Sequence, residues 1–143
     1  MAYRPCVPCE TYFKAEGIPL DENPFLNSLG VEIVSWSEGY AELSCTLKPE
    51  MLNRSGALQG GVVATLIDAA CGYSGLYAPS NEPKRHGVTI SLTVNYIGRL
   101  LRGNVRVIGR LKGAGRKVFF AYGEVLDETG AIVASGQTAH KLL

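Results

Sequence analysis

The chain has 143 residues, enough for one domain with a hydrophobic core, and its 46% hydrophobic and 19% charged content excludes an intrinsically disordered protein. Fourteen Lys and Arg residues against thirteen Asp and Glu residues leave a net charge of +1, so we expect no nucleic-acid or polyanion partner. No apolar run approaches the roughly 20 residues that cross a bilayer, and the first ten residues have no apolar segment of a secretory signal. We therefore expect a cytoplasmic protein without a membrane partner.

Residues 1–22 are predicted to be a loosely ordered leader, with prolines at positions 5, 8 and 19. Cys6 and Cys9 in this leader have the C-x-x-C spacing of redox and zinc sites. The neighbouring prolines disfavour the strand-to-helix setting of a redox pair, and further Cys or His residues at zinc-site spacing are absent from the sequence around them. We therefore expect two reduced thiols and no metal, with zinc binding as the alternative.

The hydrophobic pattern after the leader predicts two helices and six strands. Asn23 suits a helix N-cap and Pro24 the first helical position. The clearest period-two alternation runs from Val88 to Tyr96 and places Thr89 on the polar face of its strand. In chain order, the predicted elements are a short helix at 23–28, strands at 31–36 and 40–47, a polar loop at 48–57, a long helix at 58–77, and strands at 87–97, 104–111, 117–126 and 131–140.

Short turns between consecutive strands indicate antiparallel pairing, and the single long helix is apolar on every side. Such a helix belongs in a core. An antiparallel sheet that curls around one central helix satisfies both observations. The sequence therefore predicts an α+β fold in one domain over residues 23–143.

Asp68 is the only charged side chain between Arg54 and Glu82, and it lies within the apolar helix. A carboxylate in such a place loses hydration, and partners or neutralisation must offset that cost. Asp68 is therefore either a well-satisfied structural residue or a chemically active group.

The long helix begins at the sequence Leu58-Gln59-Gly60-Gly61. The first-turn amides of a helix have no internal partners, and with the helix dipole they form an anion site. Two glycines there cost about 1 kcal/mol each in helix propensity. Close approach of a ligand to the backbone, or packing of another element, would explain that cost.

The Gly60 amide could hold an oxyanion while Asp68 acts as general base or nucleophile on the same carbonyl. The two residues are eight positions apart, about 12 Å along the helix and about 80° around it. One helix therefore cannot supply both groups to one substrate. Two helices related by a twofold axis can, which predicts an obligate dimer with shared active sites.

From Asn53 to Asp68 the chain reads NRSGALQGGVVATLID. This segment resembles hot-dog-fold acyl-CoA thioesterases of the phenylacetate-pathway type, whose pattern is Asn, Gly, His-Gly-Gly and Leu-x-Asp. The resemblance runs from about Phe25 to the end of the chain. It implies a hot-dog fold, hydrolysis of an acyl-CoA or aryl-CoA thioester to the acid and coenzyme A, no cofactor, and homodimers that pair into a tetramer.

The resemblance also implies roles for individual residues. Asp68 would be the base or nucleophile, the Gly60 amide would polarise the thioester carbonyl, and Asn53 and Thr89 would position water or substrate. From the residues alone, Asn53 could equally be a turn residue and Thr89 an ordinary polar strand residue. Gln59 replaces the family's usual His and does not titrate near neutral pH, so only an orienting role is possible there. The expected substrate-binding residues are Gly61, Thr65, Asn95 and Arg116.

His86 and His140 lie outside this motif, which disfavours the His–carboxylate chemistry of hydratases and dehydratases. Several basic residues near strand ends could meet the phosphates of coenzyme A or could be ordinary edge charges. They are Arg99, Arg102, Lys112, Arg116 and Lys117. The alternative function, favoured by Gln59, is a non-hydrolytic acyl-CoA-binding or regulatory protein.

Overall fold

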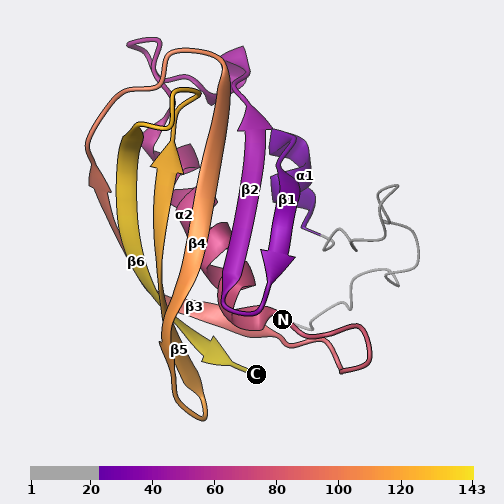
Figure 1. Cartoon of the computed structure of the whole chain (residues 1–143). Coiled ribbons are helices and arrows are strands. Elements are labelled where there is room, and N and C mark those ends of the chain that lie inside the picture. Colours follow the sequence, from indigo (N-terminus) through magenta and orange to yellow (C-terminus); the bar gives the residue numbers. More distant parts are fainter. Residues whose placement is uncertain (1–22) are drawn as a thin grey trace, which may run out of the picture.

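A computed structural model describes residues 23–143 (Figure 1). The predicted leader, with Cys6 and Cys9, lies outside the described residues. The elements are α1 (Pro24–Leu29), β1 (Glu32–Ser37), β2 (Tyr40–Thr46), the 3-10 helix η1 (Pro49–Met51), α2 (Gly60–Leu76), β3 (Gly87–Tyr96), β4 (Asn104–Ala114), β5 (Val118–Leu126) and β6 (Ile132–Leu142). The two predicted helices and six predicted strands are confirmed, and the loop predicted at 48–57 contains η1.

The first helix, α1, begins at the capping residues that the sequence predicts. The Asn23 side chain accepts a hydrogen bond from the Leu26 amide at 3.1 Å and so caps α1, which has Pro24 in its first turn. Gly30 ends the helix in the left-handed conformation, with a φ of 71°. The chain then turns directly into β1.

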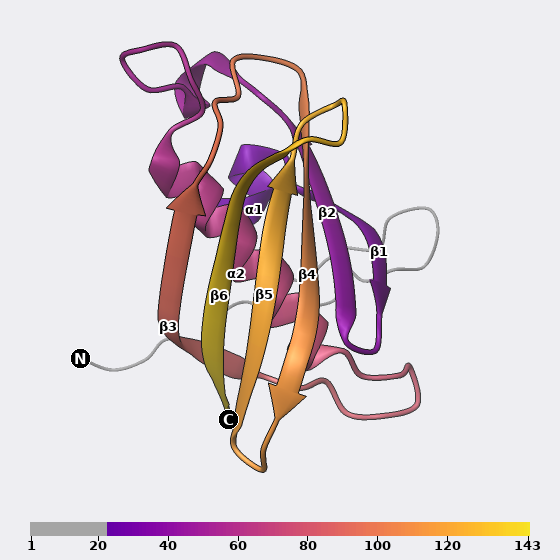
Figure 2. The ribbon, with the colours of Figure 1, turned by 60° about the vertical axis from the view of Figure 1, so that its left-hand side comes forward.

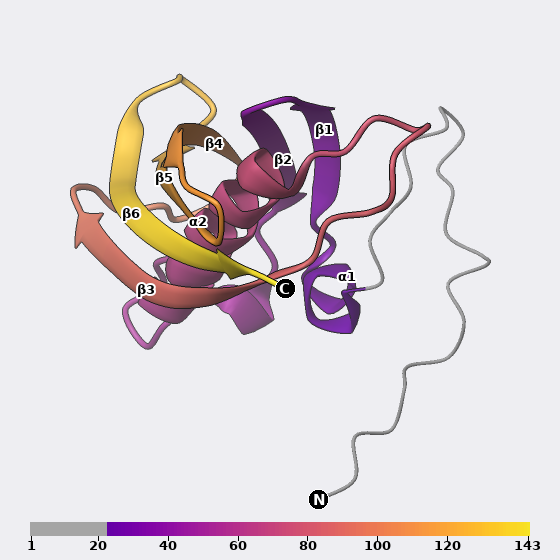
Figure 3. The same ribbon diagram turned by 90° about the horizontal axis from the view of Figure 1, so that it is seen from below.

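All six strands form one sheet in the order β1-β2-β4-β5-β6-β3, and every neighbouring pair is antiparallel (Figure 2). The sheet curls around α2, as the view from below shows (Figure 3). The predicted architecture of an antiparallel sheet around one long helix is therefore confirmed. The two strands with a free edge are β1 and β3.

The core lies between α2 and the concave face of the sheet. The helix buries residues that include Leu66, Ile67 and Ala70 against the strands. At Gly109 of β4 a Cβ atom would overlap the Ala70 carbonyl, so the helix and the sheet approach as closely as glycine allows. Along the opposite side of α2, Gly61 is exposed and Asp68 is only half-buried, so the expectation of burial on every side is not met within one chain.

The edge strand β3 differs from the rest of the sheet because its apolar side chains are exposed. Ile90 is 56% exposed and Tyr96 57% exposed, and Val88 and Leu92 are also accessible. Its partner β6 covers only one edge, so the other edge has no strand partner among residues 23–143. Within residues 23–143, no helix is long and apolar enough to span a bilayer.

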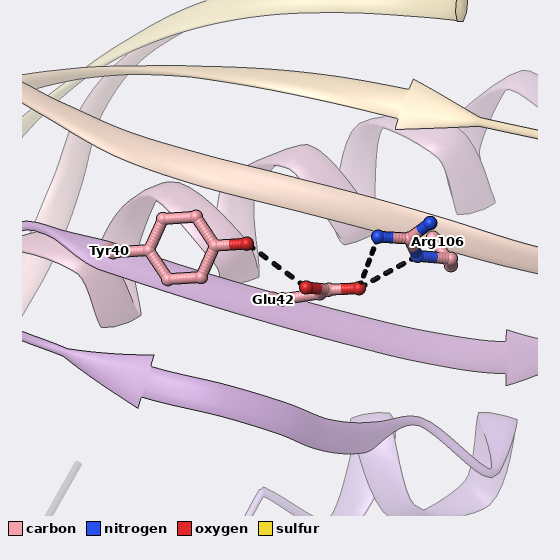
Figure 4. A network of polar contacts seen from close by, with 3 residues as sticks. All are labelled: Tyr40, Glu42 and Arg106. Carbon is pink, nitrogen blue, oxygen red and sulfur yellow. Dashed lines mark hydrogen bonds and ion pairs between the residues drawn. The ribbon is translucent and has the colours of Figure 1, made fainter. Parts of the chain in front are cut away.

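On the outer face of the sheet, away from α2, Glu42 joins two strands. Arg106 of β4 approaches the Glu42 carboxylate at 2.7 Å through Nε and at 2.6 Å through Nη2. The Tyr40 hydroxyl donates to the second carboxylate oxygen at 3.0 Å (Figure 4). Burial, and after it the bond to Glu42, raises the pKa of Tyr40. The outer-face carboxylate is thus satisfied by a guanidinium and a phenol.

Candidate active site

Asp68 lies in the third turn of α2, and one hydroxyl holds its carboxylate. The Thr89 hydroxyl of β3 donates to Oδ1 of Asp68 at 2.7 Å. Among residues 23–143, Asp68 has no Lys or Arg within ion-pair distance and no other hydrogen-bond partner for its side chain. Its remaining lone pairs are therefore available to a substrate or a water molecule.

Thr89 reaches Asp68 because a bulge interrupts β3. Thr89 pairs with His140 of β6, and Leu92 pairs with Thr138. The two paired positions are three residues apart in β3 but only two residues apart in β6, so β3 has one extra residue. The bulge at Ile90 turns Thr89 to the face that carries Leu92, toward the helix. The strict alternation predicted for this strand, with Thr89 on the outer polar face, is therefore wrong at Thr89.

His140, which the sequence analysis set aside, lies beside this pair. Its Nδ1 is 3.3 Å from the Thr89 hydroxyl and its Nε2 is 2.9 Å from the Thr138 hydroxyl. The side chain is 3% exposed and stacks on the Phe119 ring, with centroids 4.7 Å apart. Burial lowers the pKa of His140, and the charge of Asp68 partly opposes that shift.

Two glycines of α2 make room for this cluster. At Gly75 a Cβ atom would overlap the Phe119 ring, and at Gly72 it would lie 3.5 Å from Cε1 of His140. Gly72 and Gly75 follow Asp68 by four and seven residues, so all three lie on one side of the helix. Their spacing relative to Asp68 was the sequence signal that a bulky pair, here Phe119 and His140, packs beside the carboxylate.

The amino end of α2 presents free amides. Among the described residues, the backbone amides of Gly60 and Gly61 have no acceptor. The Tyr96 hydroxyl donates to the Gly60 carbonyl at 2.7 Å, and a Cβ atom at Gly60 would lie 3.3 Å from the Tyr96 ring. At Gly61 a Cβ atom would meet nothing within 4 Å. Packing against Tyr96 thus accounts for Gly60, whereas Gly61 borders open space.

Asn53 and Gln59 flank these amides. The Asn53 side-chain oxygen accepts from the Ser55 and Ala57 amides at 2.9 and 3.2 Å, which makes Asn53 the organiser of the loop before α2. Its side-chain NH2 has no acceptor among the described residues. Gln59 is the N-cap of α2, is exposed, and makes no side-chain capping bond.

The residues predicted to bind substrate do not gather at one point of the chain. The Thr65 hydroxyl donates to the Gly61 carbonyl at 2.9 Å within α2. Asn95 is exposed on β3, one residue before Tyr96. Arg116 is exposed in the turn between β4 and β5, which lies at the opposite end of the sheet from the amino end of α2 (Figure 2). No three His, Cys, Asp or Glu side chains within 23–143 converge as metal ligands would.

The chain therefore carries two separate groups along α2. The first group is the free amides at Gly60 and Gly61 with Tyr96 beside them. The second is Asp68 with Thr89 and His140, two turns further along the helix. The first group can hold a negative oxygen, and the second can accept a proton or attack a carbonyl.

Comparison with known proteins identifies the family. Residues 55–134 match the family model of the thioesterase superfamily. Over 134 residues the chain is 29% identical to the medium/long-chain acyl-CoA thioesterase YigI of Salmonella typhimurium, with 82% of this chain and 84% of that protein covered. It is 28% identical over 100 residues to SSO1253 of Saccharolobus solfataricus, with 69% of this chain covered and just under two thirds, 64%, of that protein.

A solved structure shows the same fold. The E. coli PaaI protein, from the phenylacetic acid degradation operon, superposes with a TM-score of 0.76 at 20% identity, covering 85% of this chain and 86% of that one. The match to the family model spans more than half of the chain and includes Gly60, Asp68 and Thr89. The chain therefore belongs to the thioesterase superfamily, has its hot-dog fold, and is a thioester hydrolase.

Proposed function

We propose that this chain hydrolyses acyl-CoA or aryl-CoA thioesters, with Asp68 as general base or nucleophile. The observation that carries the proposal is a carboxylate in an apolar helix whose only side-chain partner, among the described residues, is the Thr89 hydroxyl. A hydroxyl orients a carboxylate without neutralising its charge, so most of the carboxylate lone pairs stay available to water or substrate. The YigI thioesterase, named for medium- and long-chain acyl-CoA, supports this substrate class.

The reaction needs only water as a second substrate. With Asp68 as base, the carboxylate takes a proton from water while the water oxygen bonds to the thioester carbon. The carbonyl oxygen becomes an oxyanion, and the Gly60 amide stabilises it. Collapse of the intermediate breaks the carbon–sulfur bond, and the leaving thiolate receives the proton. With Asp68 as nucleophile, its oxygen bonds to the thioester carbon, the carbon–sulfur bond breaks, and a mixed anhydride and the coenzyme A thiolate result. Water then hydrolyses the anhydride to the acid and the Asp68 carboxylate, and its released proton neutralises the thiolate.

We further propose that the Gly60 amide and Asp68 of one site come from two subunits. Their eight-residue separation along α2 is too large for one carbonyl and its attacking water. The half-exposed side of α2 and the exposed apolar side chains of β3 together form an uncovered surface in the single chain. A second copy is the occupant that would cover both and complete the site.

Strand β3 carries a contact to each group. Tyr96, at its end, bonds the Gly60 carbonyl, and Thr89, near its start, bonds Asp68. The free edges of two β3 strands could pair antiparallel about a twofold axis. If the bulged residue Ile90 is left out of the register, an axis near Thr93 would set Thr89 opposite the partner subunit's Tyr96. Asp68 of one chain would then lie near the partner subunit's Gly60. We propose that such dimers pair further into a tetramer, which light scattering on the purified protein would measure.

The activity is tested on a panel of short-chain, medium-chain and aromatic acyl-CoAs, with released thiol as the readout. We expect turnover by the wild type and a loss of about 10²- to 10⁴-fold for Asp68→Ala. Equal background rates for both proteins across the panel would refute the proposal. Stoichiometric acyl-CoA binding without turnover would instead favour the non-hydrolytic alternative.

The shared site is tested with Gly60→Pro and its control Gly60→Ala. Proline is tolerated at the first helical position, and the ψ of 133° at Gln59 suits the residue before a proline. Both variants bring the same Cβ to Tyr96, but only proline removes the amide hydrogen. We expect Gly60→Pro to lose about 10²- to 10³-fold in kcat and Gly60→Ala much less.

Mixing Gly60→Pro with Asp68→Ala chains then distinguishes shared from single-chain sites. In a randomly reassembled 1:1 mixture, half of the dimers are mixed and each has one intact site, so about a quarter of wild-type activity returns. Mixed dimers that assemble but stay inactive would show that one chain supplies both groups.

Disulfide cross-linking tests the pairing of the β3 edges. A Thr93→Cys variant should form a disulfide-linked dimer, whereas Ser35→Cys on the edge strand β1 should not. Both variants are made in a Cys6→Ser/Cys9→Ser background.

A further inference from the structure

We propose that His140 is a positioning residue that fixes the Thr89 hydroxyl so that its proton points at Asp68. The inference rests on the proposed role of Asp68. His140 lies in β6, outside the region 55–134 that matches the family model, and it is buried beside Thr89. It touches Asp68 only through Thr89, so its effect on the reaction is indirect.

The hydrogen-bond partners of His140 determine which ring nitrogen carries the hydrogen. The Thr89 hydroxyl has one hydrogen, and at 2.7 Å it donates that hydrogen to the Asp68 carboxylate, which as an anion can only accept. The Thr89 oxygen must therefore accept from Nδ1 of His140, 3.3 Å away. Burial lowers the pKa of His140, so the ring is neutral near pH 7 and its Nε2 carries no hydrogen. Nε2 then accepts from the Thr138 hydroxyl at 2.9 Å.

The result is a chain of donors with one direction. Thr138 donates to His140, His140 to Thr89, and Thr89 to Asp68. Because each acceptor is filled, the Thr89 hydroxyl cannot rotate its hydrogen away from the carboxylate. Oδ1 of Asp68 is thus held in place, and the second oxygen, which has no hydrogen-bond partner among the described residues, stays available to a water or a thioester.

The surroundings hold the ring rigidly enough for this role. Phe119 stacks on His140 with planes 14° apart, and Gly72 and Gly75 leave the space that both rings occupy. The titratable groups that face this cluster are Asp68 and Cys71, both from α2. Burial raises the pKa of the Cys71 thiol to about 12, so it stays neutral and its S–H can donate but does not need the Thr138 hydrogen.

The tautomer can be measured without any enzyme assay. In the wild-type protein labelled with nitrogen-15 at histidine, we expect the NMR spectrum at pH 7.5 to show His140 protonated at Nδ1 and unprotonated at Nε2. Thr138→Val removes the donor to Nε2 and should shift the ring toward the other tautomer. A wild-type ring protonated at Nε2 would overturn the proposal, whatever the substrate of the protein.

Kinetics of matched variants test the consequence. His140→Asn keeps an N–H near the position of Nδ1, whereas His140→Leu has similar bulk and no donor. We expect His140→Leu to lose about 3- to 10-fold in kcat with an unchanged KM, and His140→Asn to recover most of that loss. Equal rates for the two variants, or a change confined to KM, would refute the positioning role. If Asp68→Ala loses activity while His140→Leu does not, the proposed hydrolysis stands and the inference about His140 fails.

Discussion

Two carboxylates on opposite sides of the sheet, Glu42 on its outer face and Asp68 on the helix against its inner face, differ in the groups that hold them. Glu42, on the outer face, is only 13% exposed and is held by the Arg106 guanidinium and the Tyr40 hydroxyl. Asp68, on α2 against the inner face, is half-buried and is held by the Thr89 hydroxyl. Burial alone does not distinguish them. The counter-charge does: the Arg106 guanidinium lies 2.6 Å from the Glu42 carboxylate, whereas no Lys or Arg among residues 23–143 lies within ion-pair distance of Asp68.

The largest expected difference between the two acids is in turnover. Asp68→Asn keeps the size of the side chain but cannot accept a proton, so kcat should fall by about 10²- to 10⁴-fold. Glu42→Gln is the equivalent change on the outer face, and kcat should stay within twofold of the wild type. Acyl-CoA hydrolysis rates of both variants, beside circular dichroism to confirm folding, make the comparison. A comparable loss in Glu42→Gln would show that the two faces are not functionally distinct.

The hydroxyls that donate to the two carboxylates, Thr89 and Tyr40, should also differ in their effect on kcat, by a smaller factor. Thr89→Val keeps the branched shape but removes the one hydroxyl that donates to Asp68 among the described residues, and a hydrogen bond to a charged group contributes about 1.5–3 kcal/mol. We expect a loss of about 10- to 100-fold in kcat. Tyr40→Phe removes one of several donors to Glu42 and should leave kcat unchanged. Near-wild-type kcat for Thr89→Val would mean that the proposed role of Asp68 does not depend on the Thr89 hydroxyl.

Asp68 stood out in the sequence, whereas the arrangement of the residues around it did not, for identifiable reasons. Asp68 stood out as one charge in a long apolar run. Thr89 followed from the family resemblance, but strand periodicity placed it on the wrong face, because one bulged residue, Ile90, is invisible to a period-two pattern. Asn53 was predicted as either a site or a turn residue. Its side-chain oxygen accepts hydrogen bonds from two backbone amides of the loop, which shows the turn role directly.

His140 was missed because β6 gives no hydrophobic signal on its inner face. The buried positions next to it in the strand are Gly136 and Thr138, small or polar residues that do not define a core face by pattern. Contacts between β6, β3 and α2 depend on pairing across distant parts of the chain, which residue order does not specify. The order of the six strands and the exposed edge at β3 likewise emerged only from the folded chain.

The inner face should also make stability depend on pH. Burial lowers the pKa of His140 below its usual value of about 6.5, so the unfolded chain binds more protons between the two values. Stability from this group is present above pH 6.5 and is lost as the pH falls toward the folded pKa. Denaturant midpoints at pH 7.5 and 5.5 should therefore differ more for the wild type than for His140→Asn. An equal difference in both proteins would assign the pH dependence to other groups.

The buried thiol of Cys71, beside the same cluster, should lower the stability of the fold at high pH. Burial raises the pKa of Cys71 from 9.0 to about 12, so the folded chain holds the thiol proton through a range in which the unfolded chain releases it. Stability from this group is complete below pH 9 and declines as the pH rises toward 12. Cys71→Ala should flatten the decline between pH 8 and 10, although it lowers stability overall because it removes buried sulfur. A decline of unchanged slope in the variant would exclude Cys71 as its source.

The smallest expected effect belongs to the outer face, where Glu42 and Arg106 form the counterpart of the inner site. Arg106 is about half exposed, so solvent screens the pair despite its two short contacts. A double-mutant cycle with Glu42→Gln and Arg106→Gln should give a coupling free energy of unfolding of about 0.5–1 kcal/mol, lower again in 1 M salt. A coupling of several kcal/mol would mean that the pair is effectively buried. Solvent would then screen the pair little, and removing Arg106 alone would leave a carboxylate that the fold cannot hydrate, which is costly.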